Sequence, residues 1–357
     1  MTRSLAKDPS RSCLKREAWP ETDRRLWLAT ITPGDLLDGG GERADCRPAT
    51  NRKIEVGYGR YLGWLQYTGN LDPSEAPAAR ITKDRVAAYI DFLGTINRRI
   101  TLLARLQELH AAALVMGPGQ DWGWIKRIES RVRARPSDSR DKRHRIVDAR
   151  DLLDLGVQLM AQSRTGTKRQ RATLFRDGLL IALLSCRPLR RANITGLEIG
   201  RHVMRRGDQW WIMIEGDATK NWDPIDMPWP LDLVAALETW LKLHRPFLVA
   251  ARGRWHSPAG DALWVSTDGS PLTQMALYDR VTEHTTNAFG HPINPHLFRD
   301  CAATTIAIED PEHIQSAAAL LGHRSLATTQ QYYNQANALD AARRMQEAIL
   351  NLRQETK

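Results

Sequence analysis

A short stretch near the end of the chain combines side chains that can bind an anion. "NPHLFRD" (294–300) places His296 and Arg299 three residues apart, so on a helix they share one face and converge on a single anionic group. Asn294 is suited to the N-cap and Pro295 to the first helical position. An unremarkable histidine and arginine on a surface helix are the alternative interpretation of the same pair.

A second histidine and a pair of tyrosines follow in "LLGHRSLATTQQYYNQ" (320–335). Gly322 supplies a left-handed cap to the preceding predicted helix, so His323 projects from a tight turn. Consecutive helical residues point about 100° apart, so only one of Tyr332 and Tyr333 can face the site that His323 occupies. Alternatively, one tyrosine belongs to the core and the other to the surface, and neither is catalytic.

Three arginines lie close together in "SCRPLRRANITGL" (185–197), directly after an apolar helix. Arg187, Arg190 and Arg191 would be costly to bury unpaired, so they meet either carboxylates or an anionic ligand. Each of the three remains a candidate for contact with that ligand. We expect Pro188 to begin a short helix that carries the last two of them.

A lysine lies in the turn of a predicted strand pair. The segments "QWWIMIEG" (209–216) and "PIDMPWP" (224–230) have strand character, and the turn between them holds Lys220, whose ammonium could reach a phosphate. The other elements predicted for this region are a first short strand over 199–204, helices over 148–163 and 171–185, and further helices after Leu231. The region is therefore predicted to be mainly α with one small antiparallel sheet.

Residues 48–135 have apolar residues at helical spacing, which predicts four amphipathic helices, and they lack the strand pattern found later in the chain. Thr50 and Thr82 are the expected N-caps of the first two helices. The polar and charged segment 136–147 is typical of an interdomain linker. The chain is therefore predicted to hold a separate all-α domain before the mixed one, with residues 1–47 as an unassigned extension.

Positive charge is spread unevenly along the 357 residues, whose formal net charge is +10. Residues 48–150 hold 19 Lys and Arg against 11 Asp and Glu, whereas residues 151–357 hold 23 against 22. Concentrated positive charge indicates a polyanionic partner, most often nucleic acid, or else a solvated basic surface. Apolar runs such as Leu179–Leu184 are far shorter than the roughly 20 residues that span a bilayer. The four scattered cysteines argue against a zinc site or a disulfide framework.

Taken in order, these motifs resemble the tyrosine recombinases, the family of phage-type integrases. An arginine, a lysine on a β-hairpin, HxxR, "LGH" and a tyrosine nine residues after that histidine follow one another as in this family. The resemblance covers residues 148–335 as a catalytic domain with the DNA breaking-rejoining enzyme fold. Less specifically, it covers residues 48–135 as a helical core-binding domain. Residues 336–357 are expected to form a C-terminal helix that docks on a neighbouring protomer or packs on its own domain.

Carried over motif by motif, the resemblance implies a set of catalytic residues, namely Arg190, Lys220, His296, Arg299, His323 and Tyr332. The pattern after the first arginine, "RRANITGL", favours Arg190 over Arg187 and Arg191. Asn193 departs from the family, which usually has an acidic residue at that position. "TTQQY" makes Tyr332 the nucleophile and Tyr333 the neighbour that turns away.

The resemblance implies transesterification at a DNA phosphodiester. Tyr332 would attack phosphorus, form a 3′-phosphotyrosine link and release a 5′ hydroxyl, with no metal or other cofactor. Negative charge develops on the non-bridging oxygens of the transition state. Arg190 and Arg299 would stabilise it, because a planar guanidinium can bind two oxygens at once.

The remaining basic residues of the set would move or donate protons. His323 would donate a further hydrogen bond to the phosphate, and Lys220 would protonate the leaving 5′ oxygen. His296 would act as base on the tyrosine or help to bind the phosphate. Such help is needed, because a tyrosine with a pKa near 10 is a weak nucleophile at pH 7.

The leading hypothesis is a site-specific DNA recombinase that integrates or excises a mobile element. Its expected partners are double-stranded DNA, three further copies of the chain in a tetramer on two DNA sites, and an accessory DNA-bending or directionality factor. No membrane partner is expected, and the absence of a signal-peptide core near residue 1 favours the cytoplasm, at the nucleoid. The alternatives are a catalytically inactive, sequence-specific DNA-binding relative and a cleavage-rejoining enzyme such as a telomere resolvase.

Overall fold

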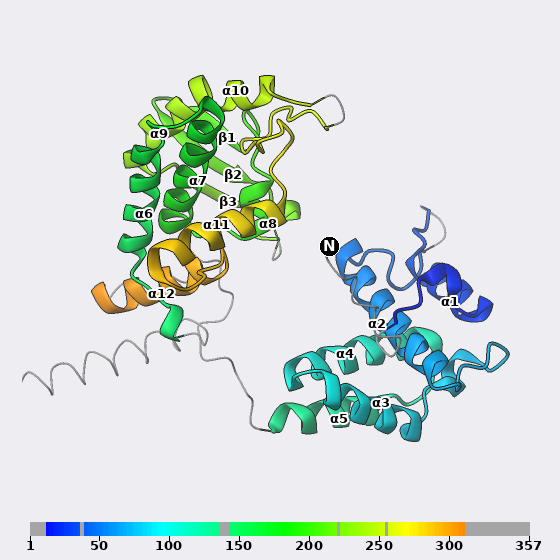
Figure 1. Cartoon of the computed structure of the whole chain (residues 1–357). Helices are drawn as coiled ribbons and strands as arrows, with labels where there is room; N and C mark the ends of the chain where they lie inside the picture. The colour runs from blue at the N-terminus through cyan, green and yellow to red at the C-terminus, as the bar shows by residue number, and fades with distance from the viewer. Residues whose placement is uncertain (1–11, 36–38, 136–142, 220–221, 254–255, 311–357) are drawn as a thin grey trace, which may run out of the picture. The chain divides into compact units, whose positions relative to one another are not determined.

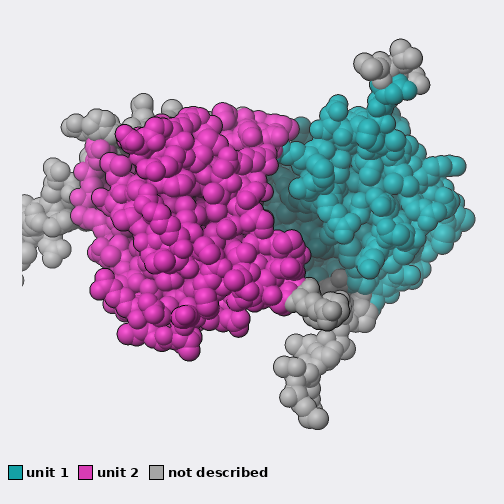
Figure 2. Space-filling view, turned by 90° about the horizontal axis from the view of Figure 1, so that it is seen from above, with its two compact units in different colours: residues 1–140 teal, residues 141–357 magenta. Residues whose placement is uncertain are grey.

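The computed structural model describes residues 12–35, 39–135, 143–219, 222–253 and 256–310. The chain divides into two compact units, residues 1–140 and 141–357, which are coloured separately in Figure 2. The division falls inside residues 136–147, the segment expected to be a linker. Each unit has a hydrophobic core of its own.

The described part of unit 1 is built from helices (Figure 1). They are α1 (Glu21–Ile31), α2 (Pro48–Tyr67), α3 (Lys83–Ile96), α4 (Arg99–Met116) and α5 (Gly123–Ala134). Helix α1 lies in the region that the sequence left unassigned. It nevertheless belongs to the core of unit 1, where Trp19 and Trp27 are buried.

The first two predicted N-caps of unit 1 had different outcomes. Thr82 caps α3 as predicted, since its side chain accepts a hydrogen bond from the backbone N–H of Arg85. The prediction for Thr50 was wrong: α2 begins at Pro48, with Arg47 at the N-cap. Proline fits the first turn of a helix because its missing N–H has no intrahelical acceptor there.

A buried ion pair ties α1 to the rest of unit 1. Asp23 and Arg80 are both fully buried and form a salt bridge, and the Tyr58 hydroxyl donates to Asp23 over 2.6 Å. The Arg80 guanidinium also donates to backbone carbonyls of the preceding loop, including that of Asp72 at 3.0 Å. The charges of the pair are therefore compensated by several hydrogen bonds, which buried ion pairs need to be stable.

Unit 2 combines helices with one small sheet, so its described part is mainly α, as predicted (Figure 1). Its α-helices are α6 (Ala149–Gln162), α7 (Lys168–Cys186), α8 (Arg191–Thr195), α9 (Val234–Thr239), α10 (Arg245–Ala250), α11 (Gln274–Phe289) and α12 (Leu297–Glu309). A π-helical turn, Trp240–His244, joins α9 to α10. Helix α7 is the central one: it packs along α6, and it also contacts α11 and α12.

The sheet of unit 2 is antiparallel with strand order β1-β2-β3. Its strands are β1 (Val203–Arg206), β2 (Gln209–Ile214) and β3 (Ile225–Pro228). The predicted bounds of the first strand, 199–204, were wrong. Residues 198–202 form a tight turn instead, in which Gly200 has a positive φ and the Val203 N–H donates to the carbonyl of Glu198. The sheet can therefore begin only at Val203.

Two glycines let α6 and α7 approach closely. A Cβ added at Gly156 would lie 2.6 Å from the backbone nitrogen of Ala182, and one added at Gly178 would lie 2.6 Å from the carbonyl oxygen of Gly156. The two helices thus meet backbone to backbone. This contact fixes the position of α7, whose C-terminal end leads into the arginine cluster.

Candidate active site

The arginine cluster forms a tight turn at the end of α7. The helix ends at Cys186, and the N–H of Leu189 donates to the carbonyl of Arg187 over 2.7 Å. Arg190 is the N-cap of α8 in an extended conformation. The expectation that Pro188 begins this helix was wrong, because Pro188 and Leu189 are used in the turn and are buried in it.

Arg299 contacts this turn directly. It lies in the first turn of α12, is buried, and donates from Nη1 to the carbonyl of Pro188 over 2.7 Å. The acceptor is two residues before Arg190, although Arg299 is 111 residues further along the chain than Pro188. The structure thus places Arg299 against the turn that carries Arg190.

The start of α12 is held by a side-chain cap. Asn294 Oδ1 accepts from the backbone N–H of His296 at 3.0 Å and of Leu297 at 3.1 Å. The α-helix begins at Leu297, and not at Pro295 as predicted, with His296 as the preceding residue. His296 is exposed to solvent and Arg299 is buried, so the two side chains of the HxxR motif meet different environments.

Lys220 lies outside the described residues, but both ends of its turn are described. Thr219 is buried, and its hydroxyl lies 2.9 Å from the carbonyl oxygen of Gly216 and 2.8 Å from that of Asp223. These contacts hold Thr219 close to Gly216 and Asp223 in the connection between β2 and β3. His323, Tyr332, Tyr333 and the expected helix at 336–357 also lie outside the described residues.

Arg187 has a role that the sequence did not reveal. Its Nε donates to the carbonyl of Pro228 over 3.3 Å, and its Nη1 donates to the carbonyl of Cys186 over 3.0 Å. Pro228 is the last residue of β3, the strand that follows Lys220. Arg187 therefore connects the Arg190 turn to the strand pair with the candidate lysine. A sequence motif does not report hydrogen bonds to distant backbone carbonyls, so no sequence signal identified this contact.

A buried charge network joins α7, the helix before this turn, to α11. Asp177 on α7 accepts two hydrogen bonds from Arg176 and one from Arg280 of α11, and it lies 3.0 Å from Nε2 of His284. Burial by itself raises the pKa of Asp177, but the neighbouring guanidiniums and the His284 hydrogen bond outweigh burial and lower that pKa to about 2.

Helix α11 also reaches the turn itself. The guanidinium of Arg191 lies over the ring of Tyr278, 5.9 Å from the centroid, which is within the range of a cation–π contact. The same helix is fixed to α7 by Arg280 and Asp177. The turn that carries Arg190 is thus braced from α7, α11, α12 and β3.

Asn193 is buried on α8, and its Nδ2 has no hydrogen-bond partner among the described residues. This residue stands where the resemblance leads one to expect an acid. A carboxylate would place a negative charge three residues after Arg190, whereas the amide does not. Arg190 is therefore positioned without a carboxylate at that place.

The described residues contain neither a cluster of metal ligands nor a helix able to span a membrane. No group of three or more His, Cys, Asp or Glu side chains there is arranged to hold a metal ion. Among the same residues, no helix has both the length and the apolar character needed to cross a bilayer.

The chain is similar in sequence to a known protein family and to several characterised proteins. The model of the "Phage integrase family" matches residues 156–338, about half of the chain. Tyrosine recombinase XerC of Azotobacter vinelandii is 29% identical over 157 residues, 44% of this chain and 47% of that protein. Tyrosine recombinase XerD of Chlorobaculum tepidum is 25% identical over 285 residues, 77% of this chain and 82% of that protein. The alignments with XerC proteins such as that of A. vinelandii thus span about half the length of the relative or less.

Solved structures with a similar fold are known. The XerH site-specific recombinase in its post-cleavage complex with a palindromic difH substrate superposes with a TM-score of 0.57 at 15% identity. The match covers 96% of this chain and 98% of that one. The pre-cleavage complex of XerH gives a TM-score of 0.52 at 17% identity. At such identities the likeness establishes the fold.

Proposed function

Because the chain belongs to the phage integrase family, we propose that it is a site-specific DNA recombinase that cleaves and rejoins DNA through a covalent 3′-phosphotyrosine intermediate. Its curated relatives are named tyrosine recombinases, and the XerH neighbour was crystallised on its DNA substrate. The observation that carries the proposal is the contact of Arg299 with the Arg190 turn, because it joins two motifs far apart in the sequence.

The two arginines are proposed to bind the scissile phosphate. A guanidinium is planar and always charged, and the hydrogen bond from Nη1 to the Pro188 carbonyl fixes that of Arg299 beside the turn. Arg190 is the N-cap of α8, two residues after the carbonyl that Arg299 contacts. Two fixed positive charges stabilise a pentavalent phosphorane without reorganisation during the reaction, which is the main source of such catalysis.

Tyr332 is proposed as the nucleophile. Its oxygen attacks phosphorus and its proton passes to a base, for which His296 is the candidate, being exposed at the start of α12. The bond from phosphorus to the 5′ oxygen breaks, and Lys220 gives that oxygen a proton. His323 is proposed to donate to a non-bridging oxygen. The phosphotyrosine bond replaces the phosphodiester bond that was broken, so rejoining is the reverse of the same step.

Arg187 is proposed as a positioning residue. It holds the carbonyls of Cys186 and Pro228, and so joins the Arg190 turn to the end of β3. Lys220 lies eight residues before Pro228. A shift of β3 by even 1 Å relative to the turn would therefore displace the general acid from the leaving oxygen, and displacements of that size can cost about 100-fold in rate.

The remaining parts of the chain are proposed to serve assembly on DNA. Residues 48–135, together with the described residues before them, form a helical unit of basic composition suited to a core-binding domain. Residues 336–357 are proposed to dock on a neighbouring protomer, in a tetramer that holds two duplexes at the nucleoid. Integration or excision of a mobile element, with an accessory DNA-bending or directionality factor, is the proposed biological setting.

A second candidate is a DNA-binding relative without cleavage activity. It is favoured by Asn193, whose amide stands at a position where an acidic residue is expected. Both candidates bind DNA, and only the recombinase forms a covalent link to it.

The two candidates are separated with a nicked suicide substrate, on which the cleaved strand end is lost and the covalent adduct accumulates. Wild type, Tyr332→Phe and Tyr333→Phe are incubated with it, and protein–DNA adducts are measured on a denaturing gel. We expect adducts with wild type and Tyr333→Phe but not with Tyr332→Phe. Absence of adducts from every variant, on DNA that the wild type binds, would favour the DNA-binding relative.

A further inference from the structure

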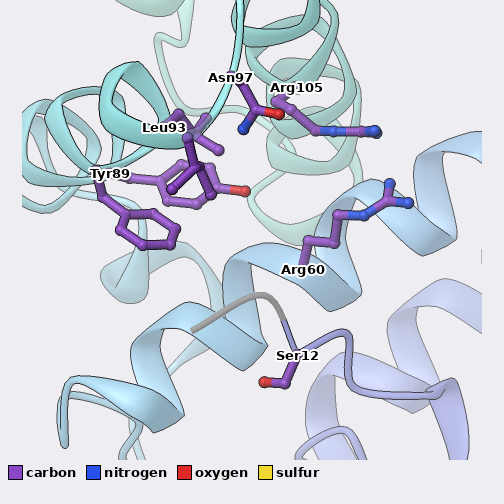
Figure 3. A pocket seen from close by; sticks show the side chains of 8 residues that line it. Ser12, Arg60, Tyr89, Leu93, Asn97 and Arg105 are labelled. Carbon is purple, nitrogen blue, oxygen red and sulfur yellow. The ribbon is translucent and has the colours of Figure 1, made fainter. Parts of the chain in front are cut away.

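A small cavity opens in unit 1, and its lining includes no residue of the candidate active site. It has a volume of about 120 Å³ and lies between helices α2, α3 and α4 and the N-terminal segment (Figure 3). Its polar lining residues come from separate elements, and they are Ser12, Arg60, Tyr89, Asn97 and Arg105. Each of them can donate a hydrogen bond, and no carboxylate is among the described residues that line the cavity. Such a lining fits an anion and not a metal cation.

The cavity carries excess positive charge. Three cations surround the buried carboxylate of Glu108: Arg105 at 2.5 Å, Arg60 at 3.9 Å and Lys53 at 4.0 Å. One negative charge therefore meets three positive ones. Only the Arg105 contact is a close pair, so the guanidinium of Arg60 retains most of its capacity to attract a further anion.

Tyr89 supplies a hydroxyl donor to the cavity. It is 2% exposed, and its ring packs against those of Trp64 and Tyr61, with centroids 5.1 and 5.2 Å away. In Figure 3 its hydroxyl points toward the space between Arg60 and Arg105. Burial raises the pKa of Tyr89 well above its ordinary value, so the hydroxyl keeps its proton.

Such a hydroxyl can donate a hydrogen bond to a ligand that enters the cavity. An anion in the cavity would accept from Tyr89, and it would also sit between the two guanidiniums. The apolar side chains of Phe92, Leu93 and Ile96 complete the lining.

The N-terminal rim of the cavity depends on two glycines of α2. The N–H of Leu14 donates to the carbonyl of Gly59 over 2.9 Å, and the Ser12 hydroxyl lies 3.4 Å from the carbonyl oxygen of Gly63. A Cβ at Gly59 would lie 2.3 Å from the Leu14 carbonyl oxygen, and one at Gly63 would lie 2.4 Å from that of Ser12. Only glycine lets the segment lie this close to α2, and this contact brings Ser12 to the cavity.

We propose that this cavity is a binding site for a phosphate group, with Arg60, Arg105 and the Tyr89 hydroxyl as its principal donors. The phosphate is that of a DNA backbone, which the site would hold through residues of unit 1. This inference rests on the proposed function only for the identity of the DNA. A free phosphate would use the same donors, and the experiment distinguishes the two sources.

The first test measures affinity of the full chain for a fluorescent DNA duplex by anisotropy over a series of salt concentrations. Tyr89→Phe, which keeps the ring, and Arg60→Gln should each weaken binding about tenfold, because each removes a charge-assisted hydrogen bond. Arg60→Gln should also make the slope of log affinity against log salt shallower by about one, and Tyr89→Phe should not. The matched control is Arg127→Gln, an exposed arginine of α5 outside the cavity, and it should change affinity less than Arg60→Gln.

The second test separates the two sources of phosphate by calorimetric titration with inorganic phosphate. Binding to wild type that is lost in Tyr89→Phe and Arg60→Gln, with DNA affinity unchanged, would assign the site to free phosphate. If both variants fold, as judged by circular dichroism, and bind both DNA and phosphate like wild type, the inference is overturned. Equal weakening by Arg127→Gln would overturn it too. None of these readouts needs DNA cleavage, so failure of the recombinase proposal would be seen separately in the adduct assay.

Discussion

Asp177→Asn is expected to destabilise unit 2 strongly at neutral pH. The carboxylate is 2% exposed, accepts hydrogen bonds from Arg176 and Arg280, and lies 3.0 Å from Nε2 of His284. The amide keeps the size of the side chain but removes the charge. The buried Arg176 then keeps its hydrogen bond to the Val265 carbonyl at 2.8 Å but loses its carboxylate partner. Breaking a buried ion pair in this way costs about 3–5 kcal/mol.

The lowered pKa of Asp177 gives a second value for the contribution of its charge to the stability of the fold. A pKa of about 2 in the folded state, against 3.8 for an ordinary aspartate, corresponds to about 2.4 kcal/mol of stability. Because the folded-state pKa is the lower one, this contribution is complete above about pH 5. It is lost as the pH falls through about 2, and roughly half of it is gone at pH 3.

Urea unfolding followed by tryptophan fluorescence would measure both quantities. The difference in unfolding free energy between wild type and Asp177→Asn should be about 3–5 kcal/mol at pH 7 and smaller by about 1 kcal/mol at pH 3. Asp154→Asn, an exposed aspartate of α6, is the control and should lie within about 0.5 kcal/mol of wild type. A loss below about 1 kcal/mol at pH 7, or a difference that does not change with pH, would refute the reasoning.

Three other substitutions test separate parts of the structure. Arg80→Met leaves Asp23 buried without its partner and should lower the unfolding free energy of unit 1 by about 3–5 kcal/mol. Arg25→Met, at an exposed arginine of α1, is the control. A change below about 1 kcal/mol for Arg80→Met would contradict the buried pair. Gly156→Ala should lower the unfolding free energy by about 1–3 kcal/mol, because its Cβ would meet the backbone of α7. Gly94→Ala, whose Cβ would have nothing within 4 Å, should raise it by about 0.5–1 kcal/mol. Equal effects of the two substitutions would refute the close contact of α6 and α7. Arg187→Leu should slow adduct formation about 100-fold with little change in DNA affinity, measured by single-turnover cleavage and anisotropy, and an equal loss of both would mean that Arg187 acts in binding.

The sequence predicted the helices of both units well where periodic apolar residues and caps agree. Thr82 before α3 is an example, since a threonine hydroxyl accepts the same hydrogen bond in any helix N-terminus. The strand pair β2–β3 was also predicted, with bounds that differ by one or two residues. Local patterns are sufficient for such elements.

Helix α1 was not predicted, because its stability comes from distant residues. Asp23 is buried there only because Arg80 and Tyr58, from later elements, compensate its charge. In a single sequence, a buried aspartate with such partners looks the same as an exposed one. The start of β1 was missed for a related reason, since the Glu198–Val203 turn depends on the positive φ of Gly200.

The candidate active site was predicted as a set of motifs, not as a geometry. The resemblance led to Arg190 and Arg299, and the structure adds that Arg299 is hydrogen-bonded to the turn before Arg190. The contact of Arg187 with Pro228 could not be predicted, because the acceptor is a backbone carbonyl and any residue provides one. The roles of Lys220, His323 and Tyr332 remain predictions.

The central claim is that Tyr332 becomes covalently joined to DNA. The most direct measurement is to trap the wild-type adduct on a suicide substrate, digest the protein and the DNA, and identify the modified peptide by mass spectrometry. We expect a single nucleotide-bearing peptide that contains residues 332 and 333, with the phosphate on Tyr332 in the fragment spectrum. A phosphate on any other residue, or an adduct with no modified tyrosine, would contradict it.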